Sequence, residues 1–295
     1  MQKMQLWQGY RSFSAQDDGR ENALRAWGVG ETGIGRRSGG TGLDEGRGEL
    51  GKGIASVCYA DVLRAYANLT GVLRFWAICN LVLRQAREQL DPQRLGIEVT
   101  IVRCLPPYKG KKIRSMYECL RIATPEEHSQ DDTLLFLGAE SLAGYAVTMG
   151  RPAVIQNLAS QNACGLGENG QAFKRSMAAY PIIRAGEIAG CFVATSVRSD
   201  YFLETERLQQ LQCYTEVIAL AFEPEEFYEP ERIELCVMPS EDVQRHYLAS
   251  MQQRIARIMT ESVVASKPIN SLEAERLAWE QLEEELFERP RAFEE

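Results

Sequence analysis

Residues 176–197, SMAAYPIIRAGEIAGCFVATSV, constrain the fold of this chain most strongly, because they have the pattern of two strands joined by a tight turn. Apolar or β-compatible side chains recur there, mostly at two-residue spacing, at Ala178, Tyr180, Ile182, Ile188, Cys191, Val193 and Thr195. Between the two strands lies Ala185-Gly186, and glycine adopts the positive φ that a short hairpin turn requires. Gly190 predicts a bulge or a close approach of another backbone segment.

The elements on either side of this hairpin follow an ordered pattern. A short helix is expected at 141–149, followed by Gly150-Arg151-Pro152 and a strand at 153–158. After the hairpin, apolar side chains three and four residues apart predict a helix at 204–222. This stretch resembles a GAF domain, and the matching positions are Gly144, Val147, Gly150, Pro152, Ile155, Pro181, Ile182, Gly186, Ile188, Gly190 and Phe202. The resemblance extends from about residue 61 to residue 222, and it concerns fold more directly than ligand.

The resemblance implies an α+β fold, with a GAF-like antiparallel sheet, helices packed on one face and a C-terminal helical extension. We expect strands at 97–105, 113–123, 153–158, 176–184 and 187–197 in one sheet, with helices 61–90 and 204–222 on one face. The chain divides into a Gly-rich segment at 1–56, a GAF-like domain at 57–223 and an acidic helical extension at 224–295. Within the extension, helices are expected at 240–264 and 271–289.

Composition and charge indicate which kinds of molecule the chain is not expected to bind. The chain of 295 residues is 45% hydrophobic and 25% charged, which is typical of a globular protein. Residues 221–295 hold 18 Asp and Glu but 8 Lys and Arg, so the whole net charge of −8 comes from this part. Direct contact with nucleic acid or an anionic membrane is therefore not expected there. The N-terminus lacks the apolar stretch of a secretory signal, and we expect a cytoplasmic protein with no membrane span.

The N-terminal segment has few apolar side chains. Residues 28–53 contain 11 glycines, so folding would cost much backbone entropy for little burial, and we expect this part to be flexible. Residues 30–38, GETGIGRRS, look like a phosphate-binding loop with arginine in place of lysine. Such a loop requires a preceding strand and a following helix, and neither is predicted here.

The eight cysteines form no metal-binding pattern, because no C-x-x-C occurs and neither histidine lies close to a cysteine in sequence. We therefore expect no metal and no cofactor. The same distance argues against the bilin attachment found in phytochrome-like GAF domains, and the nucleotide-binding GAF pattern is present only in fragments. Some proteins with the GAF fold reduce free methionine sulfoxide with cysteines near the pocket, and Cys164 lies in the corresponding loop.

The long segment 159–174 corresponds to the part of a GAF domain that caps the ligand pocket. On this basis the candidate pocket residues are Tyr117, Cys119, Asn157, Asn162, Cys164, Phe173, Tyr180, Ile182 and Cys191.

Apolar surface on the predicted helices indicates a contact with another protein. Helix 61–90 has apolar groups on more than one face, and the C-terminal helices add two further apolar stripes. Soluble monomers rarely expose such stripes, so we expect them to bury against a second subunit or a protein partner. The candidate interface residues are Tyr66, Leu73, Trp76, Ile255, Ile258, Trp279, Leu282 and Leu286.

These observations favour a non-enzymatic GAF-type sensor or regulatory subunit that acts through protein–protein contact and binds a small ligand. Two alternatives stay open, a structural adaptor with a degenerate pocket and a cysteine-based methionine sulfoxide reductase.

Overall fold

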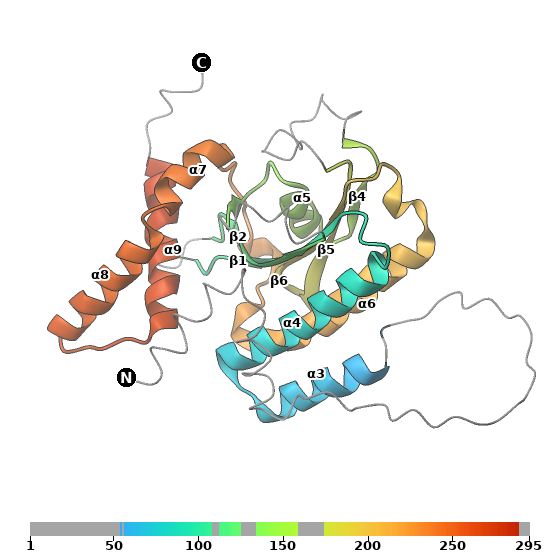
Figure 1. Ribbon diagram of the computed structural model, residues 1–295. Helices are drawn as coiled ribbons and strands as arrows, with labels where there is room; N and C mark the ends of the chain where they lie inside the picture. Colours follow the sequence, from blue (N-terminus) through green and yellow to red (C-terminus); the bar gives the residue numbers. More distant parts are fainter. Residues whose placement is uncertain (1–53, 55, 108–111, 125–133, 159–173, 289–295) are drawn as a thin grey trace, which may run out of the picture. The chain divides into compact units, whose positions relative to one another are not determined.

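The computed structural model describes residues 54, 56–107, 112–124, 134–158 and 174–288. Its centre is a six-stranded sheet of order β3-β2-β1-β6-β5-β4, in which every neighbouring pair is antiparallel (Figure 1). The strands are β1 (Ile97–Cys104), β2 (Met116–Ala123), β3 (Phe136–Leu137), β4 (Ala153–Ile155), β5 (Ser176–Arg184) and β6 (Glu187–Ser196). The five expected strands are all present, and the α+β fold class is confirmed.

The β5–β6 hairpin forms as its sequence predicts. Ala185 and Gly186 both have positive φ, 53° and 88°, so the two turn residues match the twist of the strands. The register between the strands shifts at Ile182, opposite Gly190. A Cβ atom at Gly190 would lie 2.0 Å from the carbonyl oxygen of Val102 on β1, so glycine is required for this close approach.

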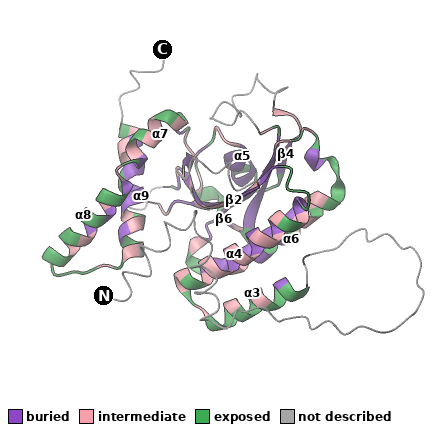
Figure 2. Ribbon diagram, viewed as in Figure 1, coloured by how far each residue is buried: buried purple, intermediate pink, exposed green. Residues whose placement is uncertain are grey.

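Two helices cover one face of the sheet, α4 (Gly71–Leu90) and α6 (Thr205–Ile218), as expected (Figure 1). They pack on alternate residues of the strands, including Val99, Ile101 and Phe192. Figure 2 shows that α4 and α6 bury the sides that face the sheet, whereas much of α3 (Ser56–Asn68) is exposed.

The expected single helix at 61–90 is wrong, because α3 and α4 are separate. Leu69 and Thr70 lie between them, and Gly71 begins α4 with a φ of 55°. The Gly71 N–H donates to the Glu223 carboxylate at 3.0 Å, which holds the start of α4 to the segment that follows α6. A helical sequence pattern continues through this break, and the backbone reverses locally at the glycine.

The opposite face carries α5 (Leu142–Met149). The Ser141 hydroxyl caps its start by accepting from the Gly144 N–H at 2.9 Å, and Gly150 ends it in the left-handed region. A Cβ atom at Gly144 would lie 1.9 Å from the Gly138 carbonyl oxygen, so α5 packs closely against the end of β3.

The C-terminal extension is part of the same packed unit, Gly51–Glu295. After the single-turn helices η6 (Pro224–Glu226) and η7 (Pro230–Arg232), the chain pairs with the segment before β2 through a parallel bridge between Ile113 and Ile233. Helices α7 (Glu241–Leu248), α8 (Met251–Val264) and α9 (Ser271–Glu288) follow. The expected helix 240–264 is thus two helices, α7 and α8, separated at residues 249–250.

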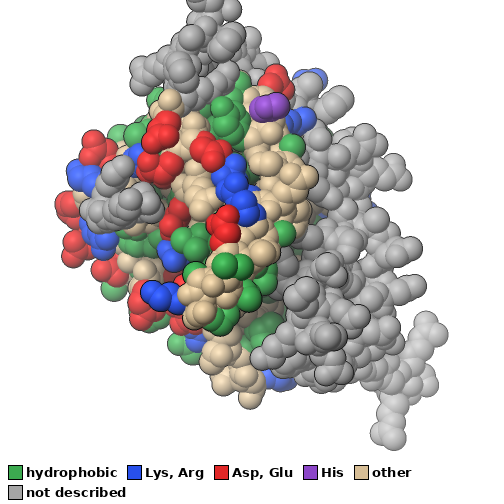
Figure 3. Space-filling model, turned by 90° about the vertical axis from the view of Figure 1, so that its left-hand side faces the viewer, with side chains coloured by type: hydrophobic (Ala, Val, Ile, Leu, Met, Phe, Trp, Pro, Cys, Tyr) green, Lys and Arg blue, Asp and Glu red, His purple; other side chains and the backbone are tan. Residues whose placement is uncertain are grey.

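The extension buries its apolar side chains against the β3 edge of the sheet. Trp279 on α9 is 2% exposed and contacts Tyr117 and Phe136 of strands β2 and β3. Acidic residues of α9 pair with arginines, as in the 2.6 Å contacts of Arg114 with Glu283 and Glu284. Figure 3 shows acidic and basic side chains mixed with apolar ones on this side of the unit.

Within the described ranges, the helices are all too short or too polar to cross a membrane. The expected flexibility of residues 28–53 concerns a segment outside the described residues.

Candidate functional site

Charged and polar side chains gather on the sheet face that carries α5. Strand β1 alternates between Val99 and Ile101, which pack toward α4, and Glu98 and Thr100, which point to the opposite face. Across the ladders, Thr100 pairs with Arg121 on β2, and Glu98 pairs with Thr195 on β6. Directly paired residues share a face. The set is Glu98, Thr100, Glu118, Arg121, Lys174 and Thr195, which we call the polar face.

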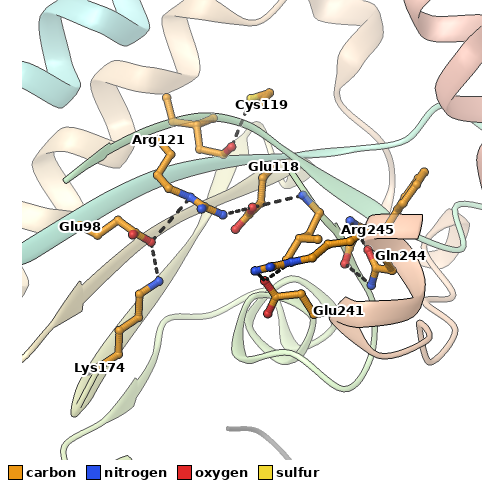
Figure 4. A network of polar contacts seen from close by, with 11 residues as sticks. Glu98, Glu118, Cys119, Arg121, Lys174, Glu241, Gln244 and Arg245 are labelled. Atoms are coloured by element: carbon orange, nitrogen blue, oxygen red, sulfur yellow. Dashed lines mark hydrogen bonds and ion pairs between the residues drawn. The ribbon is translucent and has the colours of Figure 1, made fainter. Parts of the chain in front are cut away.

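Four charges on the polar face form one chain of contacts (Figure 4). Lys174 Nζ lies 2.5 Å from Glu98 Oε1, and Arg121 Nε lies 3.7 Å from the same oxygen. Arg121 also forms an ion pair with Glu118, which in addition accepts from the Leu135 N–H at 3.3 Å. Two acids and two bases therefore compensate one another on this face of the sheet.

Burial changes the acid–base properties of this group. Desolvation raises the pKa of the Glu118 carboxyl, although Arg121 and Lys174 act in the opposite direction. Burial opposes the charge on Arg121, but the carboxylates of Glu118 and Glu98 outweigh it and raise the pKa of Arg121. The pair therefore consists of a fixed cation and a carboxylate that is easier to protonate than usual.

Thr195 adds an unused hydrogen-bonding group to the polar face. The residue is 3% exposed, and its hydroxyl oxygen has no hydrogen-bond partner among the described residues. A buried hydroxyl usually has a partner, because leaving it without one costs about 1–3 kcal/mol. Thr195 thus supplies a donor and an acceptor that a bound molecule could use.

The described pocket candidates divide between the two faces of the sheet and the contact with the C-terminal extension. Cys119, Tyr180 and Ile182 lie in the apolar cluster beneath α4 and α6, whereas Cys191 lies in the cluster beneath α5. Tyr117 is partly buried and stacks on Trp279, so it belongs to the contact with the C-terminal extension.

The other pocket candidates stand apart from these. Asn157 is partly buried after β4, and Asn162, Cys164 and Phe173 lie outside the described residues. The polar face shares none of the predicted pocket residues, and a pocket lined by that set stays a prediction.

Two of the described thiols, those of Cys119 and Cys191, are deeply buried. The seven described cysteines are all free. Burial raises the pKa of the Cys119 thiol to about 12, and it raises the pKa of Cys191 further. Cys119 and Cys191 also pack on opposite faces of the sheet, which separates the two thiols that the reductase alternative would pair with Cys164.

Residues of the polar face were missed because their strands were interpreted as apolar. The signal was present in the sequence, since Glu98 and Thr100 alternate with Val99 and Ile101. Polar or charged residues at alternate positions of a central strand indicate a polar environment on that face. Among the described residues, no group of three His, Cys, Asp or Glu side chains could hold a metal ion.

The predicted interface residues divide into two groups. Ile255, Ile258, Trp279, Leu282 and Leu286 are buried within the chain. The premise that the C-terminal stripes lack a cover is therefore wrong, because the β3 edge covers them. Tyr66 and Leu73 are 45% and 49% exposed, and Trp76 is partly buried. Association with another protein stays a prediction.

Comparisons with known proteins find similarity over part of the chain, which corresponds to one domain. Residues 77–223 match the GAF domain family. Solved structures similar to this chain include the GAF domain of an Acinetobacter phosphoenolpyruvate-protein phosphotransferase, at 10% identity and a TM-score of 0.40, covering 57% of this chain and 93% of that one. They also include the free methionine-R-sulfoxide reductase of Neisseria meningitidis, at 13% identity and a TM-score of 0.39, covering 57% and 89%.

A third similar structure is the GAF domain of a Coxiella burnetii phosphoenolpyruvate-protein phosphotransferase, at 18% identity and a TM-score of 0.37, covering 56% and 89%. Among curated proteins, the comparison finds no match to the sequence. GAF domains are typically small-ligand-binding modules of sensor and regulatory proteins. The family match covers the sheet, α6, most of α4 and the polar face, so this chain belongs to the GAF domain family through residues 77–223.

Proposed function

We propose that the protein is a non-enzymatic sensor or regulatory subunit that binds a small polar molecule at the polar face and acts through protein–protein contact. The observation that carries this proposal is the placement of Glu98, Glu118 and Arg121 on one sheet face beside the Thr195 hydroxyl, which has no hydrogen-bond partner in the described part of the chain. Charges are rarely placed in the middle of a sheet without a function, because their desolvation is costly.

The polar face is favoured over the opposite face by its packing. Large apolar residues of α4 and α6, such as Phe75 and Tyr214, fill the opposite face. The polar face instead offers carboxylate acceptors, cationic donors and one hydroxyl. A ligand that has both donors and acceptors would suit this set, since either sign alone would leave part of it unmatched.

Retention of a ligand tests the proposal. Native mass spectrometry of the full chain should show a bound molecule, and thermal-shift assays with cyclic nucleotides and free amino acids, methionine sulfoxide included, should identify its class. Thr195→Val removes this hydroxyl and should weaken ligand binding. The free energy of unfolding should stay the same or rise, because no hydrogen bond within the described residues is lost. Thr215→Val is the matched control, because that buried hydroxyl already donates to the Leu211 carbonyl at 2.7 Å on the other side of the sheet.

Two outcomes would replace the proposal. Turnover of methionine sulfoxide with a thiol reductant would establish the reductase alternative. Equal behaviour of the two threonine variants, with no molecule retained, would favour the structural adaptor. That second candidate has an observation of its own, since the four charges of the polar face already pair with one another.

Helix α3 supplies the surface that we propose for the partner. Tyr59, Leu63 and Tyr66 recur at four and three residues along one face of α3, and they are 41%, 57% and 45% exposed. Leu73 at the start of α4 is 49% exposed. Exposed apolar side chains in a continuous helical stripe are typical of a contact with another protein.

A further inference from the structure

The side chain of Gln244 pairs with the outer edge of β3. It accepts from the Phe136 N–H at 2.8 Å and donates to the Phe136 carbonyl at 3.1 Å, so one amide takes the place of a neighbouring strand. It also donates to the Pro239 carbonyl at 2.9 Å, and it is 2% exposed. This contact attaches α7 to β3, and we call it the latch.

Leu135, the residue before Phe136, is hydrogen-bonded to a residue of the polar face. Leu135 is bonded twice to Glu118, since its N–H donates to the carboxylate at 3.3 Å and its carbonyl accepts from the Glu118 N–H at 2.9 Å. Glu118 is the residue that forms an ion pair with Arg121. Figure 4 shows the resulting series of contacts, from Lys174 through Glu98, Arg121 and Glu118 to the segment that Gln244 binds.

Helix α7 also places one acidic side chain, Glu241, near this network (Figure 4). Glu241 contributes to raising the pKa of Arg121, and it pairs with Arg245 one turn along α7 at 2.5 Å. The first turn of α7 therefore lies beside the polar face as well as binding β3 through Gln244 (Figure 4).

We propose that the charge pairing of Glu118 with Arg121 sets how firmly the latch holds, so that a molecule which takes Arg121 from Glu118 releases α7 from the sheet edge. This regulation rests on the function proposed above. A paired carboxylate is a strong acceptor for the Leu135 N–H, whereas a buried carboxyl that loses its cation takes a proton and accepts less well. Leu135 then loosens, and Phe136 moves with it.

Release would leave the outer edge of β3 without its partner. The free N–H and carbonyl of Phe136 form part of a sheet edge that can pair with a strand of another protein. Occupancy of the polar face would in this way be converted into an interaction surface.

Hydrogen exchange of the full chain tests the coupling without any ligand. Glu118→Gln removes the paired charge and should raise exchange of the Phe136 amide and of α7 on the order of tenfold, with strands β5 and β6 unchanged. Gln244→Leu should raise α7 exchange by itself. In the double variant the two effects should be less than multiplicative, because both act through one contact.

Several results would overturn the proposal. Fully multiplicative rates in the double variant would mean that the two contacts are independent. Glu187 is a partly exposed residue at the other end of β6. If Glu187→Gln raises the exchange rate of α7 as much as Glu118→Gln does, the effect is not specific to Glu118. If Glu118→Gln does not fold, Glu98→Gln tests the same series one contact further away. If a ligand binds and the hydrogen exchange of α7 does not change, the proposed control of the latch is refuted. The proposed function, ligand binding at the polar face, would still stand.

Discussion

The indole ring of Trp279 stacks on the phenol ring of Tyr117, with the ring centroids 4.8 Å apart and the planes inclined by 29°. Tyr117 belongs to β2, inside the GAF domain, and Trp279 belongs to α9, 56 residues beyond the end of the family match. The C-terminal extension therefore shares a core with the GAF domain.

This contact predicts that the extension stabilises the whole unit. Trp279→Ala should lower the free energy of unfolding by about 3–5 kcal/mol, since a large buried aromatic side chain leaves a cavity. Leu203→Ala is the control, because Leu203 is 64% exposed and its loss should cost less than about 0.5 kcal/mol. Urea unfolding followed by circular dichroism measures both. Equal stabilities would show that α9 contributes nothing to the folded state.

A second prediction concerns the pH dependence of stability at Asp91. Its carboxylate accepts from the Thr124 hydroxyl and from the backbone N–H groups of residues 95–97. Burial would raise the pKa of Asp91, but these hydrogen bonds outweigh it and lower the pKa. The stabilisation is therefore complete above the unfolded-state pKa of about 3.9 and is lost as the pH falls through the lower folded-state pKa.

Asp91→Asn should accordingly cost about 2 kcal/mol at neutral pH, and the difference from the wild type should shrink below about pH 4. Asp200→Asn is a suitable control, since Asp200 is exposed and its positive φ suits asparagine equally. Thermal unfolding across the acid range gives both curves. A cost at Asp91 that stays constant with pH would rule out the charged form as the source.

Two glycines allow a matched test of the close approach in the hairpin. Gly190→Ala should destabilise by about 3 kcal/mol, because the new Cβ would meet the Val102 carbonyl. Gly186→Ala should cost only about 1–2 kcal/mol, since its φ is positive but nothing lies within 4 Å of the new Cβ. Similar values in chemical unfolding would mean that the strands can separate to accommodate the methyl group.

Thiol reactivity provides a prediction that bears on the reductase alternative. Because burial raises the pKa of Cys104 and Cys119 to about 12, both thiols should resist alkylation in the native protein at neutral pH. Cys213 and Cys236 are partly exposed and should react sooner. Mass spectrometry of peptides after timed iodoacetamide labelling ranks them. Rapid labelling of Cys119 would reopen a catalytic role for it.

The proposed contact through α3 predicts an effect on association alone. Leu63→Ser with Tyr66→Ser should weaken self-association or partner binding by removing apolar surface, each side chain contributing on the order of 2 kcal/mol. Unfolding stability should change little, because both side chains are exposed. Val263→Ser with Val264→Ser is a control on another exposed helix end, where the side chains are 66% and 81% exposed. Light scattering decides, and a wild type that stays monomeric and without a partner would contradict the proposal.

The sequence allowed the sheet to be predicted because its strands follow local rules. Alternating apolar residues and the Ala185-Gly186 turn fix the β5–β6 hairpin within a few residues. The break between α3 and α4 was not predictable by the same rules, since apolar spacing continues across Leu69 and Thr70 while the reversal depends on Gly71 and its bond to Glu223.

Contacts between distant residues account for the rest of the difference. The stripe that includes Trp279 and Leu286 was correctly predicted to need a cover, but sequence periodicity cannot distinguish a cover within the chain from one on another protein. The polar face also depends on contacts between distant residues, because Glu98 and Arg121 become neighbours only when β1 and β2 pair.

The bond between Phe136 and Gln244 spans 108 residues of chain, and this has a consequence for synthesis. A ribosome that has released the complete family match, to residue 223, has not yet supplied the groups that close the β3 edge. During that interval the emerging domain presents an open strand, which is the state most prone to pairing with other chains. Maturation of this GAF domain thus waits for helices that follow it in the chain.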